Sequence, residues 1–220
     1  MRTWIQTIEE STQLFSPIGL RLIDDLTGNS PIGRIQAILE LQDAGGEWKD
    51  TKIAPVITAS GTVTYPGLER HADATGKLPK QFRVRLKPQF YVPLYRRDRD
   101  GLLCTAFPYD NSHPPQNIKQ LPDDVILAPA TNYPFEGQIP VARGMVVDAA
   151  NASVPNAVVT QGAKERVLTD QRGCFALPLR WVKPNPALPI DAANERNGQQ
   201  GTTNIQFPQD LTRNIKIQIH

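Results

Sequence analysis

The sequence has few of the residues on which most catalytic and metal sites depend. It contains two cysteines and three histidines among 220 residues. Cys104 and Cys174 lie in apolar runs without a second Cys or His at a metal-ligand spacing, and His71, His113 and His220 are scattered. We therefore expect two buried, reduced cysteines, solvated histidines, and neither a metal nor a cofactor.

Motifs for nucleophilic catalysis are also missing. Ser60 and Ser112 lie beside Gly61 and His113, but neither occurs in a Gly-x-Ser-x-Gly turn between a strand and a helix. The acidic pairs at 24–25 and 123–124 and the alternating charges at 96–100 are more typical of solvated loops than of ion sites. The sequence predicts a protein that is not an enzyme, although an enzyme whose site leaves no motif stays open.

Long apolar runs and a strong net charge are absent as well. No stretch approaches the roughly 20 apolar residues of a membrane span, and the first residues lack the apolar run of a signal peptide. We expect no membrane span, and synthesis in the cytoplasm without a signal peptide. Lys and Arg number 24 against 22 Asp and Glu, which leaves a charge of +2. This balance does not favour a nucleic-acid partner.

Proline, by contrast, is plentiful. The 20 prolines are spread along the chain and leave no room for long helices. Between them lie short runs in which apolar residues alternate with polar or small ones, at 18–22, 35–41, 82–86 and 215–219. Alternation of this kind gives a strand one buried and one solvated face. The pattern predicts an all-β fold.

The length is sufficient for two domains, each with its own core. Residues 106–124 combine Pro-Pro, Asn-Ser and Asp-Asp with little periodicity, which predicts a long proline-rich surface loop. We place an N-terminal arm at 1–15, a first β-sandwich at 16–137 and a second at 138–220.

Two features are candidates for partner binding. Residues 3–13 predict a short amphipathic helix with Trp4, Ile5 and Ile8 on one side. A helix this short is not stable alone, so it must dock either on its own sandwich or in a groove of a neighbouring subunit.

The second candidate is a row of cations. Arg83, Arg85 and Lys87 alternate with apolar residues and so share one face of a predicted strand. This row could meet an acidic partner surface, or it could keep an edge strand from pairing with other chains.

The second half of the chain carries a recurring order of strand, Asp turn, Pro-led strand, Thr-Asp-x-x-Gly turn and aromatic strand. On these residues it resembles the carboxypeptidase regulatory-like, or transthyretin-like, β-sandwich module over roughly residues 141–220. The matching positions are Gly144, Val146, Asp148, Val154, Pro155, Ala157, Val159, Thr169, Asp170, Gly173, Phe175 and Leu177. The family's Pro-Gly turn and late Gly-Tyr are replaced here by other residues.

The aspartates and the glycine of these turns have a structural explanation. An Asp side chain accepts hydrogen bonds from amides two residues further on, and Gly tolerates the positive φ at the end of such a turn. We therefore interpret Asp148, Asp170 and Gly173 as structural turn residues. A weaker copy of the same order occurs in the first half, with Asp24 over Asp148 and Gly61 over Gly173.

The fold prediction is thus all-β, with two tandem transthyretin/Ig-like β-sandwich domains and a short N-terminal helical arm. The resemblance does not bring peptidase activity, because the zinc motif is missing. It implies a non-enzymatic structural or adaptor protein whose partners are other subunits of a larger assembly, with a homo-oligomer also open. A phage tail or tail-like contractile particle, and hence a virion or an extracellular particle, is the assembly that it implies. The alternative is a carbohydrate- or peptide-binding β-sandwich module.

Overall fold

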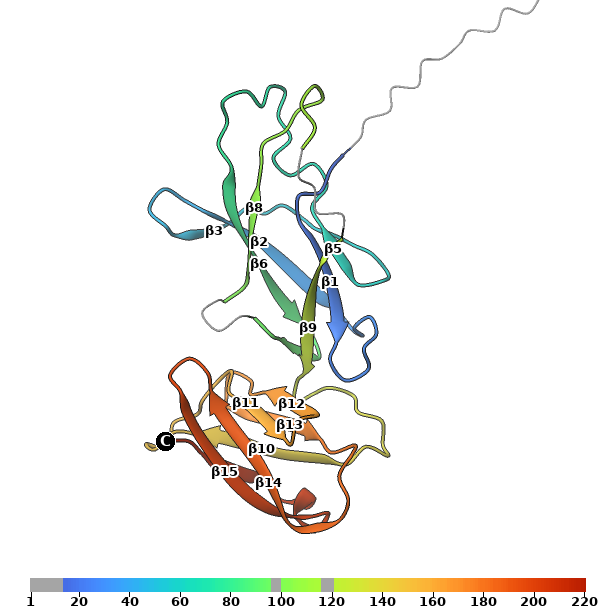
Figure 1. The fold of residues 1–220 in the computed structure, drawn as a ribbon, viewed down its shortest axis with the longest axis vertical. Helices are drawn as coiled ribbons and strands as arrows, with labels where there is room; N and C mark the ends of the chain where they lie inside the picture. Colours follow the sequence, from blue (N-terminus) through green and yellow to red (C-terminus); the bar gives the residue numbers. More distant parts are fainter. Residues whose placement is uncertain (1–13, 96–99, 116–120) are drawn as a thin grey trace, which may run out of the picture.

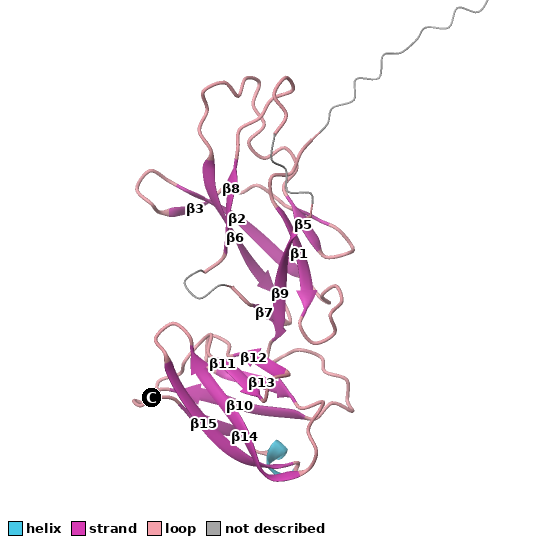
Figure 2. Cartoon of the chain, viewed as in Figure 1, coloured by secondary structure: helices cyan, strands magenta, loops and turns pink. Residues whose placement is uncertain are grey.

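The computed structural model describes residues 14–95, 100–115 and 121–220, and these ranges are all-β (Figures 1 and 2). The helical element found in them is one short 3-10 turn, η1, at Gln209–Thr212. No helix of the described ranges is long and apolar enough to cross a membrane. The predicted helical arm, with Trp4, Ile5 and Ile8, lies outside the described residues.

Strands β1 to β9 surround one hydrophobic core, and we call them the N-terminal unit. Its first sheet has the order β4-β5-β1-β9-β7, with β4 Val56–Ile57, β5 Thr62–Thr64, β1 Gly19–Asp24, β9 Asp123–Pro129 and β7 Tyr91–Pro93. Its second sheet has the order β3-β2-β6-β8, with β3 Trp48–Asp50, β2 Ile35–Gln42, β6 Lys80–Pro88 and β8 Leu102–Ala106. Leu20 and Leu127 of the first sheet share this core with Leu39 and Val84 of the second.

Strands β10 to β16 surround a second core, and we call them the C-terminal unit. One sheet has the order β13-β10-β16, with β13 Cys174–Pro178, β10 Val141–Val147 and β16 Ile215–Gln218. The other has the order β12-β11-β14-β15, with β12 Glu165–Leu168, β11 Val158–Gln161, β14 Asn185–Asn194 and β15 Gln199–Phe207. Figure 1 shows the two groups of strands one after the other along the molecule.

The two units have the same strand connectivity. In each, the first strand pairs antiparallel with a strand that follows a Gly turn and parallel with the last long strand, as β5-β1-β9 and as β13-β10-β16. The opposite sheets also correspond, β3-β2-β6-β8 to β12-β11-β14-β15. Even one turn bond is repeated, because the Leu22 amide donates to the Gly61 carbonyl and the Val146 amide donates to the Gly173 carbonyl. N-terminal strands β4 and β7 are additions to this shared plan.

The alternating runs form strands for the expected reason. Leu20 and Leu22 in β1, and Ile215 and Ile217 in β16, are buried, while the residues between them are partly or fully exposed. The residues of β2 and β6 alternate in the same way over most of their length. Period-two burial in each sheet places one face on a core and leaves the other for solvent or for polar contacts.

The Thr-Asp-x-x-Gly stretch forms a tight corner before β13. The Asp170 carboxylate accepts hydrogen bonds from the Arg172 and Cys174 amides at 2.8 and 2.9 Å. Gly173 has a φ of +73°, and a Cβ there would lie 2.7 Å from the Val146 carbonyl oxygen. Asp148 closes a similar turn by accepting from the Ala150 and Ala152 amides. Both aspartates therefore serve as acceptors for turn amides.

Two expectations about burial are wrong. Asp24 is not a solvated loop residue but is 1% exposed, because it accepts hydrogen bonds from two core tyrosines. Cys104 and Cys174 were predicted to be buried, but both are partly exposed. Cys104 lies on an edge strand and Cys174 begins a strand directly after a turn, where neither side chain is fully covered.

Polar contacts join the two units near the end of β1. Arg166 forms a bidentate ion pair with Asp25, at 3.0 and 3.1 Å. Arg180 donates to the Leu26 carbonyl at 2.6 Å and also forms two bonds with the buried carboxylate of Glu165. Arg180 therefore contacts both units, and the buried Glu165 carboxylate holds its guanidinium in the position that bonds Leu26.

Candidate functional site

Two openings border strand edges of the N-terminal unit. One opening lies beside β8 and the other beside β2. We call them the β8 cavity and the β2 groove.

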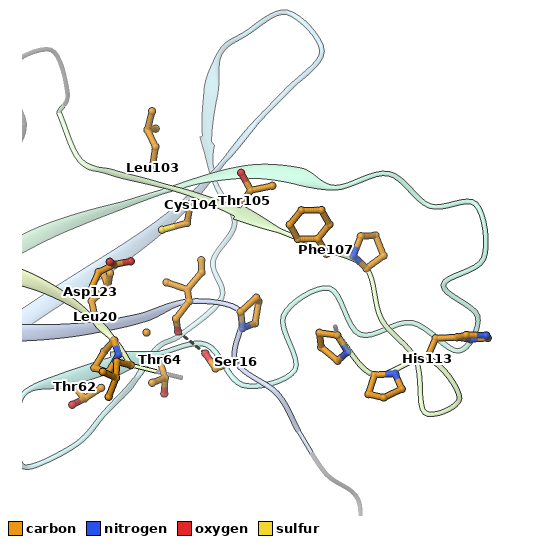
Figure 3. A pocket seen from close by; sticks show the side chains of 18 residues that line it. Ser16, Leu20, Thr62, Thr64, Leu103, Cys104, Thr105, Phe107, His113 and Asp123 are labelled. Atoms are coloured by element: carbon orange, nitrogen blue, oxygen red, sulfur yellow. Dashed lines mark hydrogen bonds between the residues drawn. The ribbon is translucent and has the colours of Figure 1, made fainter. Parts of the chain in front are cut away.

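The β8 cavity has a volume of about 690 Å³ and lies between edge strand β8 and the start of β1 (Figure 3). Its lining includes Leu103 and Phe107, which are 41% and 57% exposed, together with Thr62, Thr64 and several prolines of the proline-rich loop. Figure 3 shows Leu103, Cys104 and Thr105 on one side of the opening and Ser16, Thr62 and Thr64 on the other. The cavity therefore combines an apolar surface with hydroxyl groups.

The counterpart of this cavity in the C-terminal unit is closed by hydrogen bonds. There, β15 corresponds to β8, and the Gln200 and His220 backbones exchange two hydrogen bonds, at 3.3 and 3.2 Å. Gly201 packs so closely on the Gln218 carbonyl that a side chain would not fit between them. The second sheet thus meets the end of the first sheet's last strand directly.

The β2 groove has a volume of about 440 Å³ and follows the first half of β2. Strand β3 pairs with β2 only at residues 40–42. The Thr51 amide makes a last bond to the Leu39 carbonyl, and Lys52, with a φ of 61°, turns the chain away toward β4. Among the described strands, none pairs with residues 35–38 on this side.

The matching strand of the C-terminal unit is paired along its whole length. Each residue of β11, from Val158 to Gln161, has a partner in β12. In β2, backbone groups point to alternate sides, so the groups of Ile35 and Ala37 face the same side as those of Leu39. Because β2 has eight residues and β11 has four, residues 35–38 extend beyond the stretch that the hairpin strand pairs, and the backbone of this extension lines the groove.

The walls of the β2 groove are aliphatic and its rim carries positive charge. Ile53 and Ile57, which are 45% and 41% exposed, line the side opposite β2. Arg34 lies at the Ile35 end, and its guanidinium forms no ion pair with any residue that the structure describes. Lys52, also on the rim, is paired with Asp50 at 2.7 Å. An extended segment with aliphatic and acidic side chains matches this lining.

The predicted cation row has a different environment at each position. Arg83 and Arg85 both contact the Glu40 carboxylate at 2.6 Å, and Glu40 is 4% exposed. The Arg83 guanidinium also lies over the Trp48 ring, 4.7 Å from its centre. Two of the three charges therefore bind a buried carboxylate of the same sheet, and only Lys87 is fully exposed.

Other buried carboxylates, which sequence reasoning assigned to loops, are held by neighbouring donors. Asp24 accepts from the Tyr133 and Tyr91 hydroxyls at 2.7 and 3.2 Å. Burial, with the Asp24 charge as a smaller cause, raises the pKa of Tyr91 to about 12. Asp110 accepts from three backbone amides, of which the Ala74 amide has the largest effect, and these bonds lower its pKa to about 2.

These groups do not converge on a metal-binding arrangement. The described ranges contain no cluster of three or more His, Cys, Asp or Glu side chains that could hold a metal ion. His113 contacts Asp110, and His71 contacts Glu69 at 3.3 Å, while the Glu69 carboxylate also pairs with Lys80. Sequence reasoning did not find the two open edges. For the β2 groove, the sequence offers one local indication, the Asp-Thr-Lys turn at residues 50–52, where the pairing of β3 with β2 ends.

Comparison with known proteins adds little to this description. No family model matches the chain, and no curated protein matches it. Among solved structures, the Bacillus anthracis TIE protein is similar over 92% of this chain, at 12% identity and a TM-score of 0.31. This chain spans 32% of the length of that protein.

Proposed function

We propose that this chain is a non-enzymatic structural or adaptor protein, made of two tandem transthyretin/Ig-like β-sandwich domains, that binds extended segments of other subunits. The observation that carries this proposal is the pair of open strand edges in the N-terminal unit. Residues 35–38 of β2 extend beyond the stretch that β3 pairs, edge strand β8 borders a cavity, and both lie beside exposed apolar side chains.

Open edges of this kind are costly unless they are used. An unpaired strand invites pairing with other chains, and proteins normally cover such strands or shorten them. Addition of a partner strand supplies the missing backbone bonds, and side-chain pockets then give specificity. The β8 cavity and the β2 groove each combine a strand edge with an apolar lining, which supports strand addition as the mode of binding.

The C-terminal unit acts in this proposal as a fixed spacer. Its contacts through Arg166 and Arg180 hold the N-terminal unit in place. A large multi-subunit particle, such as a phage tail or a tail-like contractile particle, uses rigid blocks of this type. The particle itself is the part of the proposal that comes only from the family resemblance.

Native mass measurement of the tagged protein, isolated from its source, tests the proposal. We expect a stoichiometric complex well above the 24.4 kDa of one chain. Leu103→Lys should release the partner that binds the β8 cavity, whereas Leu78→Lys, at an exposed leucine that does not line either opening, should not. A monomer that stays monomeric with its native companions present would contradict the proposal.

A second candidate, carbohydrate binding, has one specific observation in its favour. The lining of the β8 cavity includes both the exposed Phe107 ring and the hydroxyls of Thr62 and Thr64, and a sugar needs both an apolar face and polar groups. A glycan that binds the monomer and loses affinity on Phe107→Ser would favour this candidate over the first.

A further inference from the structure

We infer that the β2 groove binds the N-terminal segment of a neighbouring copy of this chain, residues 4–10, as an added antiparallel strand in place of the helix that its sequence pattern predicts. This inference rests on the proposed function and names the partner segment for one of the two openings. The segment reads Trp-Ile-Gln-Thr-Ile-Glu-Glu, which is apolar at its start and acidic at its end.

The backbone of the groove is prepared for such a strand. The groups of Ile35 and Ala37 face the groove because they lie on the side from which Thr51 bonds Leu39. Residues 35–38 lie beyond the stretch of β2 that β3 pairs, so a short segment added there would continue the sheet along this edge.

Side chains and charges match in one orientation. An antiparallel segment places Glu9 and Glu10 toward the Ile35 end, where Arg34 has no ion pair within the described residues. The same orientation places Trp4 and Ile5 at the Leu39 end of the groove. Because successive strand residues face opposite sides, we assign Ile5 to the side of Ile53, a lining residue of the aliphatic wall. Lys87, the exposed member of the cation row, pairs across the sheet with Gln36 and adds positive charge beside the groove.

The geometry favours a neighbouring copy over the same chain. Phe15 is fixed at the Lys80 end of β6, because its amide bonds the Tyr109 hydroxyl and the Tyr109 amide bonds the Glu69 carbonyl. Glu69 in turn pairs with Lys80 at 2.9 Å. Arg34 lies at the opposite end, where Ile35 pairs with Pro88.

The chain between Glu10 and Leu14 is too short for Glu10 to reach Arg34 of the same copy. Strand β6 has nine residues and therefore spans about 27 Å from Lys80 to Pro88. Glu10 precedes Leu14 by four residues, so it can reach at most about 14 Å from it. Within one chain the two glutamates fall short of Arg34, whereas those of a neighbouring copy have no such restriction.

Disulfide trapping between two differently tagged copies tests the inference. One copy carries Ile5→Cys and the other Ile53→Cys, and the mixture is oxidised under mild conditions. We expect a cross-linked heterodimer that depends on both substitutions and that exceeds the level formed by the native cysteines in either single variant. If the link forms only within a chain that carries both substitutions, or does not form, the inference is wrong.

A charge exchange provides a second readout in the full-length chain. Arg34→Glu should weaken self-association by about tenfold, since a favourable charge contact becomes a repulsive one. Combining it with Glu9→Lys and Glu10→Lys should restore most of the affinity, while Lys183→Glu, at an exposed lysine of the C-terminal unit, should have little effect. Self-association that is unchanged by Arg34→Glu would overturn the inference.

The result is separable from the proposed function. A chain that fails to cross-link but still forms a complex with other native subunits would refute this inference and leave the proposed function standing. A chain that is monomeric in both experiments would refute both.

Discussion

Replacement of Glu40 by glutamine tests whether Arg83 and Arg85 hold the fold or serve a partner. Glutamine keeps the volume of the side chain and removes its charge, leaving both arginines without their carboxylate. Arg83 is 15% exposed and contacts Glu40 through both Nε and Nη2 at 2.6 Å. Because this ion pair is largely buried, breaking it should lower the free energy of unfolding by about 3 kcal/mol. Arg85 is 41% exposed, so solvent screens its ion pair with Glu40, and that pair should contribute only about 0.5 kcal/mol to the free energy of unfolding.

The expected loss of unfolding free energy is therefore about 3 to 4 kcal/mol for Glu40→Gln. Arg83→Gln should cost most of that amount, because it leaves Glu40 buried with only Arg85, whereas Arg85→Gln should cost about 1 kcal/mol or less. Urea unfolding followed by tryptophan fluorescence measures each value, and Trp48, which stacks on Arg83, reports on this sheet.

A double-mutant cycle of Glu40→Gln with Arg83→Gln isolates the pair itself, and we expect a coupling free energy above about 1 kcal/mol. Two results would refute the reasoning. One is a loss below about 1 kcal/mol for Glu40→Gln. The other is a complex that dissociates on Arg85→Gln while stability is unchanged, because that arginine would then serve a partner.

Three further predictions concern stability. Gly144→Ala should destabilise the C-terminal unit by about 3 kcal/mol in urea unfolding, because its Cβ would overlap the Ile215 carbonyl, while Gly137→Ala, in open space, should be neutral. The pKa of Asp110 is lowered from its ordinary value of 3.8, so its carboxylate stabilises the fold at pH values above 3.8, and this contribution disappears as the pH falls toward 2. Asp110→Asn should therefore make the melting temperature depend less on pH in this acid range. Arg180→Gln should cost about 3 kcal/mol and increase hydrogen exchange at the end of β1, because it leaves buried Glu165 unpaired and removes the bond to Leu26; unchanged exchange would contradict this coupling.

Much of the fold could be predicted from local patterns. Period-two burial identifies β1, β2, β6 and β16, since a strand between core and solvent leaves that trace in the sequence. The match of Asp24 with Asp148 and of Gly61 with Gly173 anticipates the shared connectivity, because turns of the same geometry need the same small set of residues. Local rules are sufficient where local geometry decides the structure.

The environment of charged residues could not be predicted in the same way. Arg83 and Arg85 lie 43 or more residues from Glu40 in sequence, and only the register of β2 on β6 brings them to it. Asp24 looks like any loop aspartate until Tyr133, 109 residues away, covers it. The open edges were hidden for a related reason. Whether a strand has a neighbour depends on where another segment leaves the sheet, and at β2 that point is the turn at Lys52.

The charge around the β2 groove also explains how an open edge can be selective. Two β2 edges brought together would place Arg34 and Lys87 of one copy near those of another, and like charges across paired strands oppose such pairing. Pro55, on the opposite wall, has no amide to donate to a strand added there. The same cations favour an acidic segment, so the features that prevent indiscriminate edge-to-edge pairing also select the partner. On this reasoning, neutralising Arg34 and Lys87 together should broaden association into non-specific aggregation, whereas reversing only Arg34 should simply lose the acidic segment.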